Sequence, residues 1–242
     1  MAIEYFFVNR EESLVRGVKT ILAAALCLAA VPVPAQAEGM AIGAGSAGSV
    51  DITQAGRPTS TGPIAPCETG AIPASRSGPV RVGSNIRYGP SETACTRNAD
   101  GAASVSVSGQ RFETTILAAF GGPTIKIRTY EAGCRTTANG SSGYLELSGV
   151  SGFDVPSQIP ANYTVTIPSV SAARSASVEG GGGAADGASP SALPMAEVVL
   201  NEVIVPSPPD GSLVIHAVHI RLFPHGGPDG GDIVVGSAAC AP

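Results

Sequence analysis

The stretch SLVIHAVHIRLF, residues 212–223, decides the fold, because it is the longest apolar and β-branched run beyond the amino-terminal 40 residues. Successive side chains of a β-strand point to opposite faces of the sheet. Strict alternation places one set of side chains on one face (Val214, His216, Val218, Ile220, Leu222) and the rest on the other (Leu213, Ile215, Ala217, His219, Arg221, Phe223). Both sets are mostly apolar, so the sequence predicts an interior strand of a sheet that is covered on both sides.

The segments on either side of this stretch predict an antiparallel meander. Residues 196–205 (AEVVLNEVIV) form a second apolar run, and the turn-forming sequence PSPPDG separates it from the first. A further turn cluster, PHGGPDGG at residues 224–231, leads into DIVVGSA at residues 232–238. Proline, glycine and Asp-Gly pairs end strands and favour turns, so three consecutive strands are expected here.

Shorter segments with a period of two indicate the rest of an all-β domain. They are residues 79–88, 102–108, 124–130, 144–150 and 162–167, while residues 112–120 fit either a strand or a short helix. Residues 38–52 suggest one weak strand, and residues 53–77 are predicted to be turn-rich loop. Residues 171–194, with four glycines at 180–183, are predicted to be a mobile surface loop. The expected fold is an antiparallel β-sandwich at residues 79–242, preceded by an N-terminal segment at residues 38–78 that the pattern does not place.

The amino-terminal 37 residues have the features of an export signal. Arg10, Arg16 and Lys19 precede an apolar run at residues 21–33, and Ala35-Gln36-Ala37 supplies small residues for cleavage. The run is shorter than the roughly 20 residues that span a bilayer. No later run is long enough to span a membrane, and nothing follows Pro242. A secreted, extracellular protein is therefore expected, with residues 1–37 removed as a signal peptide.

Four cysteines remain after that cleavage: Cys67, Cys95, Cys134 and Cys240. An even number in an exported chain favours disulfides, and none of the four forms a C-x-x-C pair. Three pairings are possible. We favour Cys67 with Cys95, which closes a local turn-rich segment, and Cys134 with Cys240, which ties the carboxyl terminus to a mid-chain strand.

Charge and motif content exclude several functions. The formal net charge is −5 and the basic residues are scattered, which disfavours nucleic acid as a partner. The chain lacks G-x-S-x-G, H-E-x-x-H and P-loop motifs. Four consecutive glycines are followed by no lysine or helix start, so no phosphate site is expected. Asp229 and Asp232 supply too few oxygens for calcium. No cofactor and no metal ion are indicated.

The histidines are the first candidates for chemistry. Strict alternation puts His216 and His219 on opposite faces, so they are not expected to bind one metal together. His216 is interpreted as a core histidine, His219 as the better functional candidate, and His225 as a solvated turn residue. Glu202 could meet His219 across the meander, and Asp232 opens the next strand. The set Glu202, His219 and Asp232 is therefore a weak candidate for a ligand or hydrolytic site, although nothing fixes a nucleophile beside it.

Five short matches in the same order resemble the choice-of-anchor P proteins. They are SSGYLELSG at 141–149, PANYT at 160–164, VVLNE at 198–202, HAVH at 216–219 and GDIVVGSA at 231–238, within about residues 102–240. The resemblance implies an exported, β-rich extracellular protein of actinobacterial type with no assigned molecular function. Some members of this group carry a C-terminal anchor; nothing of that kind follows Pro242 here, so we expect release unless another protein holds this one.

Three functions are thus carried forward. The first is a non-enzymatic extracellular or envelope interaction module with an unknown partner. The second is a carbohydrate- or ligand-binding sandwich, for which the absence of Trp and only five Tyr offer little support. The third is a secreted hydrolase that uses Glu202, His219 and Asp232.

Overall fold

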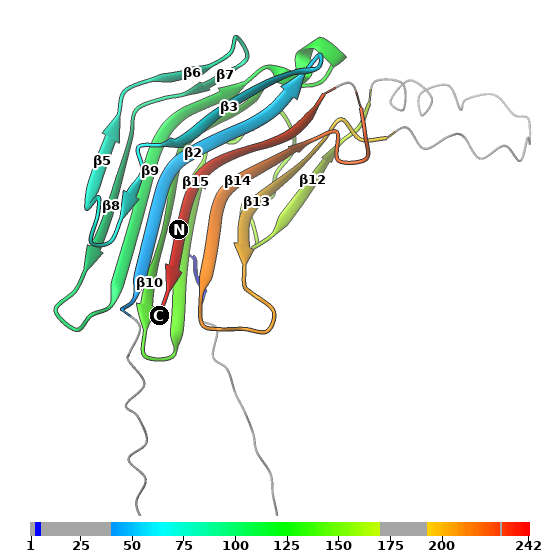
Figure 1. Ribbon diagram of the computed structural model, residues 1–242. Helices are drawn as coiled ribbons and strands as arrows, with labels where there is room; N and C mark the ends of the chain where they lie inside the picture. Colours follow the sequence, from blue (N-terminus) through cyan, green and yellow to red (C-terminus); the bar gives the residue numbers. More distant parts are fainter. Residues whose placement is uncertain (1–2, 6–39, 170–192, 228) are drawn as a thin grey trace, which may run out of the picture.

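Two antiparallel sheets pack face to face in the computed structural model, which describes residues 3–5, 40–169, 193–227 and 229–242 (Figure 1). The all-β sandwich is therefore confirmed. One sheet, here sheet A, has the strand order β1-β11-β10-β9-β7-β6, with β8 and β5 joined to it beside β9. The other, sheet B, has the order β12-β13-β14-β15-β2-β3, with β4 paired to β2.

The strand bounds follow from the hydrogen-bonded ladders. Sheet A contains β1 (Ile3–Tyr5), β5 (Ala74–Ser77), β6 (Val80–Val82), β7 (Ile86–Tyr88), β8 (Ser91–Arg97), β9 (Ala103–Thr114), β10 (Ile125–Thr137) and β11 (Gly140–Ser148). Sheet B contains β2 (Ile42–Gln54), β3 (Arg57–Ile64), β4 (Cys67–Glu68), β12 (Tyr163–Ile167), β13 (Ala196–Ile204), β14 (Leu213–Leu222) and β15 (Gly230–Ala241). The ambiguous segment at residues 112–120 is divided: its first residues, up to Thr114, belong to β9, and Ile116–Phe120 form a short 3₁₀ helix.

The predicted meander is present as β13, β14 and β15, and β14 lies inside sheet B. The prediction that β14 is covered on both faces is wrong. One face packs into the core through residues such as Ile215 and Ile220, while Val214, His216, His219 and Arg221 are only partly buried on the outer face. The outer face of sheet B is therefore available to carry a site.

The segment before residue 79 belongs to the sandwich. The weak strand expected at residues 38–52 is the 13-residue strand β2, which pairs with β15 along most of its length. The prediction that residues 53–77 form a loop is wrong, because β3, β4 and β5 lie within this range. β1 pairs with the outer edge of β11 and lies upstream of the expected cleavage site. The rest of the predicted signal lies outside the described residues, as does most of the predicted loop at residues 171–194.

The alternation of side chains changes phase along one line across sheet B. In β14 the buried positions run Leu213, Ile215, Ala217 and then Val218, Ile220, Leu222, so two adjacent residues face the core. The same shift occurs at Leu200/Asn201 in β13, Val235/Gly236 in β15 and Ala47/Gly48 in β2. Asn201 and Gly236 have φ angles of 53° and 62°, in the left-handed region that permits such a change of direction. Beyond this line, residues that strict alternation assigns to one face lie on the other.

Aliphatic side chains from both sheets fill the core, together with the aromatic rings of Tyr88, Phe112 and Tyr130. Cys67 bonds to Cys95 and Cys134 to Cys240, which confirms the favoured pairing. Both bridges connect sheet A to sheet B, since β4 and β15 lie in one sheet and β8 and β10 in the other. Among the described residues, no helix is long and apolar enough to cross a membrane.

Candidate functional site

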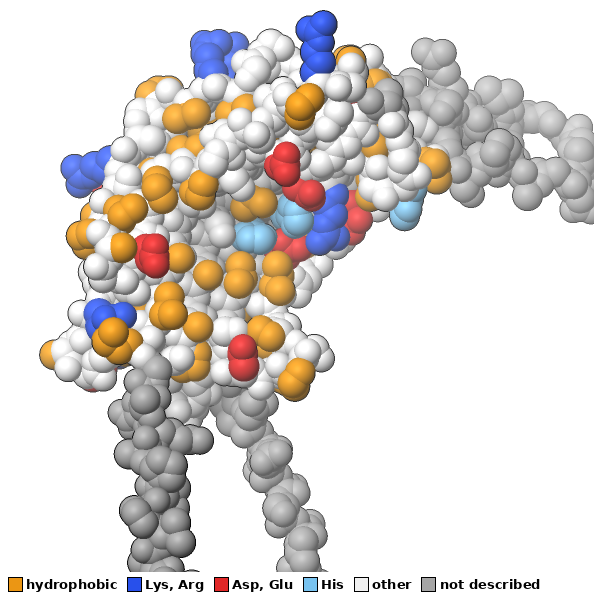
Figure 2. All heavy atoms as spheres, viewed as in Figure 1, with side chains coloured by type: hydrophobic (Ala, Val, Ile, Leu, Met, Phe, Trp, Pro, Cys, Tyr) orange, Lys and Arg blue, Asp and Glu red, His pale blue; other side chains and the backbone are white. Residues whose placement is uncertain are grey.

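Charged and imidazole side chains gather on the outer face of sheet B, over β13, β14 and β15 (Figure 2). Strand register explains the gathering. Glu202 lies opposite His216, Val199 opposite His219, and Glu197 opposite Arg221, while Asp232 on β15 faces Arg221 from the other side. We call Glu202, His216, His219, Arg221 and Asp232 the outer-face cluster.

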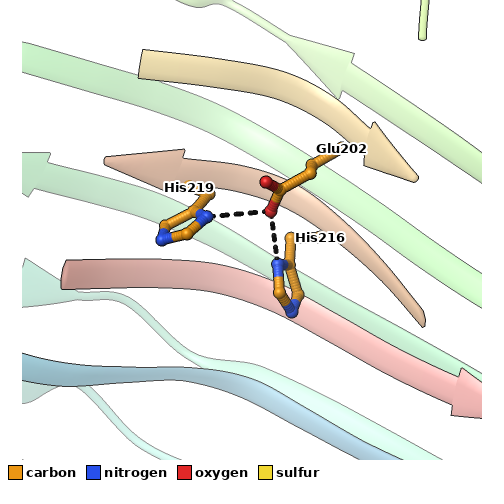
Figure 3. Close-up of side chains that lie close together, drawn as sticks. All are labelled: Glu202, His216 and His219. Atoms are coloured by element: carbon orange, nitrogen blue, oxygen red, sulfur yellow. Dashed lines mark hydrogen bonds and ion pairs between the residues drawn. The ribbon is translucent and has the colours of Figure 1, made fainter. Parts of the chain in front are cut away.

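The Glu202 carboxylate is the centre of the cluster. Its Oε2 accepts hydrogen bonds from Nδ1 of His216 at 2.7 Å and from Nδ1 of His219 at 2.9 Å (Figure 3). Its Oε1 accepts from Nη2 of Arg221 at 3.0 Å. The Glu202 side chain is 7% exposed, so these bonds largely replace its hydration.

His219 connects two carboxylates. While Nδ1 faces Glu202, Nε2 lies 2.8 Å from Oδ1 of Asp232. An imidazole can donate from both nitrogens only when it is protonated, so this arrangement describes an imidazolium held between Glu202 and Asp232. The sequence hypothesis that Glu202, His219 and Asp232 come together is confirmed in its geometry.

The charges of the cluster shift its pKa values in directions that follow from these contacts. Burial alone raises the pKa of Glu202, but hydrogen bonds from His216 and His219 and their positive charge outweigh it and lower the pKa from 4.5 to about 2. Burial alone lowers the pKa of His219, but its bonds and attraction to Glu202 and Asp232 raise it above 6.5. Ionised Glu202 and protonated His219 therefore stabilise each other.

Two predictions about His216 are wrong. It does not belong to the core, because its side chain is on the outer face and 15% exposed. It also does not lie on the opposite face from His219, since the rings are 5.7 Å apart between centroids. The phase change at Ala217/Val218 is the reason: an odd spacing that crosses it returns to the same face. His225 is exposed, as expected for a turn residue.

The ligand atoms of Glu202, His216 and His219 all lie within 4.8 Å of one another, which is the spacing of a metal site. Two imidazoles and a carboxylate are a ligand set of catalytic and exchangeable zinc sites, with a fourth position left open. The N···O separations of 2.7 and 2.9 Å are hydrogen-bond distances. Metal–ligand bonds of about 2.0–2.1 Å in tetrahedral geometry separate ligand atoms by roughly 3.3 Å. Binding would therefore replace the Nδ1 protons and spread the three side chains by about half an ångström.

The surroundings of these three side chains match those of metal ligands. A histidine that binds a metal through one nitrogen usually donates from the other to a carboxylate, and Asp232 occupies that position on His219. Arg221 holds the second oxygen of Glu202, which would fix that carboxylate as a single-oxygen ligand. Sequence reasoning missed both His216 and Arg221 as site residues. The feature that identifies them is their position next to Glu202 on the neighbouring strand, and only the strand register reveals that position.

Hydrolytic chemistry has less support in this geometry. Among the described residues, no serine, threonine or cysteine side chain hydrogen-bonds to either histidine. Ser237 lies opposite His216 on β15, but the backbone around it is tied into the ladder and offers no cluster of amides for an oxyanion. The Asp232 carboxylate contacts the far nitrogen of His219 and so lies away from any atom bound at Nδ1. The arrangement is better suited to holding an ion than to activating a nucleophile.

The fold and the cluster thus define a disulfide-braced β-sandwich with a His–Glu site on one outer face. No family model matches the chain, and no curated protein or solved structure matches it either.

Proposed function

We propose that this protein is an exported, non-enzymatic β-sandwich that binds a divalent transition-metal ion, of which zinc fits best. The ion is held by Glu202 Oε2, His216 Nδ1 and His219 Nδ1. The observation that carries the proposal is the convergence of these three atoms within 4.8 Å on a partly exposed face. Imidazole nitrogens favour zinc, copper and nickel over calcium and magnesium, which take oxygen ligands.

Export is supported by the two disulfides, which form and persist in oxidising compartments. The signal-like amino terminus and the resemblance to choice-of-anchor P proteins point the same way. Under this proposal the protein is released outside the cell or held in its envelope, and the interaction module of the sequence hypothesis acts through its metal site. The partly exposed position lets an incoming ligand reach the fourth coordination position.

The test is a titration of the metal-free protein, after chelator treatment and with its disulfides intact, with Zn²⁺ by calorimetry or competition with a fluorescent indicator. We expect one ion per chain. His216→Ala and His219→Ala each remove a ligand and should weaken binding at least tenfold. His225→Ala is the matched control, because His225 is exposed and outside the cluster. Binding that is absent, or that falls with His225→Ala but not with His216→Ala, would overturn the proposal.

Asp232→Asn separates a metal site from a simple ion-pair network. An asparagine can still accept a hydrogen bond from Nε2 of His219 but no longer compensates its charge. Loss of such an outer carboxylate typically weakens metal binding about 10- to 100-fold. Asp51→Asn is the control, because Asp51 is the exposed cross-strand neighbour of Asp232 and, within the described part of the chain, forms no hydrogen bond or ion pair with a histidine. Equal effects of the two substitutions would argue against a specific role for Asp232.

A further inference from the structure

A hollow lies on the opposite side of the sandwich from the outer-face cluster, on the outer face of sheet A. Its volume is about 300 Å³, and its lining includes Tyr144, Arg135 and the hydroxyl side chains of Ser104, Thr137 and Ser142. Neither the outer-face cluster nor its charges take part in it. The hollow combines an aromatic ring, one guanidinium and several hydroxyls.

Small residues around one large ring create the hollow. Gly133 on β10 lies between Ser106 on β9 and Tyr144 on β11. The Tyr144 ring covers Gly133, since a Cβ at that glycine would clash with Cε1 of Tyr144. A ring that rests on a glycine backbone is held in place by packing, and such an aromatic–glycine pair is a known device for stabilising strands. Tyr144 is also only partly buried, so the packed ring keeps accessible surface.

Polar groups flank the ring on both sides along the strands. In the next row toward the end of the hairpin, Arg135 lies between Ser104 and Ser142. The Arg135 guanidinium forms no ion pair or hydrogen bond with any other residue that the structure describes. In the row on the other side, Glu131 lies between Ser108 and Glu146. Hydrogen-bond donors are therefore concentrated on one side of the ring and acceptors on the other.

The hollow continues beyond Arg135. A second depression of about 600 Å³ shares Arg135 and Thr137 with the first and extends to Arg97 and Asp100. The two depressions adjoin at Arg135 and Thr137, and we call them together the groove; its volume is larger than one ring-sized unit fills. A groove of this kind suits an extended ligand better than a single small molecule.

We propose that this groove binds a neutral oligosaccharide, with one sugar ring stacked on Tyr144. A sugar presents a C–H face that packs on an aromatic ring and hydroxyls at its rim that both donate and accept. Arg135 donates to these hydroxyls and Glu131 accepts from them. Arg135 and the hydroxyls of Ser104, Thr137 and Ser142 favour a ligand that carries hydrogen-bonding groups. The row of Glu131 and Glu146 disfavours an acidic glycan by repulsion. This inference is independent of metal binding.

The test uses the protein with its disulfides intact against arrays of neutral and acidic oligosaccharides, followed by calorimetry with each positive compound. We expect binding to neutral oligosaccharides of two or more units. Tyr144→Ala should weaken it roughly 2- to 10-fold, which is the usual effect of one aromatic contact. Tyr144→Phe keeps the ring and should bind within about twofold of the unmodified protein. Arg135→Gln should weaken binding about tenfold, as expected for a hydrogen bond from a charged group.

Two controls make the outcome decisive. Arg81→Gln removes an exposed arginine on β6, away from the groove, and should leave binding unchanged. Thermal unfolding of each variant shows whether Tyr144→Ala is folded, and Arg135→Gln tests the site if it is not. Binding of acidic glycans only, binding unaffected by both Tyr144→Ala and Arg135→Gln, or no binding of any neutral oligosaccharide would each overturn the inference.

Discussion

Glu202→Gln is the substitution that tests the outer-face cluster most directly. Because the native contacts lower the pKa of Glu202 from 4.5 to about 2, the ionised carboxylate stabilises the folded state by about 3 kcal/mol at neutral pH. That stability is fully present above pH 4.5 and is lost as the pH falls through 2. Loss of one partner from a buried charge pair typically costs a similar 3–5 kcal/mol. Glutamine keeps the shape of the side chain and removes its charge.

The assay is urea unfolding of the metal-free protein at pH 7 and at pH 3, with disulfides intact. We expect Glu202→Gln to lower the free energy of unfolding by about 3 kcal/mol at pH 7 and by only about 1 kcal/mol at pH 3, because at pH 3 the carboxyl group of the unfolded chain is already protonated while the native one is still mostly ionised. Glu197→Gln is the control. Its carboxylate is 3.8 Å from Arg221 and its side chain is 31% exposed, so it should cost less than about 1 kcal/mol at either pH. A cost of Glu202→Gln that is the same at both pH values would refute the electrostatic reasoning.

Three further outcomes follow from the geometry. Affinity for Zn²⁺, measured between pH 5 and pH 8, should rise about tenfold per pH unit until the pH passes the raised pKa of His219. The reason is that the ion has to displace one proton from that imidazolium, and an affinity independent of pH would contradict this. Replacing both cysteines of one bridge with serine should lower the free energy of unfolding by roughly 5 kcal/mol for Cys134–Cys240 and roughly 3.5 kcal/mol for Cys67–Cys95. The reason is loop length, because the bridged residues are 106 and 28 positions apart. Denaturant unfolding measures both losses, and a reversed order would refute the loop-length argument. Gly236→Ala should destabilise the fold by roughly 1–3 kcal/mol, since φ is 62° and the new Cβ would lie 2.7 Å from Cδ2 of Tyr130; an unchanged melting temperature would show that the strand adapts.

The sandwich and the meander could be predicted from the sequence because their strands alternate between core and solvent. The disulfide pairing could be predicted from the compartment and the position of the cysteines. Strand β3 could not be predicted from the sequence, because it is an edge strand with mostly exposed side chains and so needs no apolar alternation. β2 was underestimated because glycines stand where its side chains would face Val105 and Val107 of the opposite sheet. The sequence pattern of one strand does not show that side chains of the opposite sheet fill the space beside its glycines.

The candidate site was predictable in part for the same reason. Glu202, His219 and Asp232 lie on consecutive strands of a predicted meander, so their meeting needs only antiparallel pairing. The place of His216 depends on the phase change at Ala217/Val218, and nothing within residues 212–223 marks it. Ala217 fits either face, and the sequence of one strand does not show that Asn201 and Gly236 have left-handed backbone on the neighbouring strands.

A large side chain of the opposite sheet packs at the line of the phase change. Tyr130 of β10 projects from sheet A to the line where sheet B changes phase, and its hydroxyl donates to the carbonyl of Ala47 at 3.0 Å. The ring lies against Gly236, and Ala217 is the next small residue along the same row. Small residues on three adjacent strands make room for one tyrosine, and the backbone beside them turns to keep its ladder bonded. The same phase change brings His216 to the face of His219, so the packing of Tyr130 on the inside and the meeting of the two histidines on the outside occur at one line across sheet B.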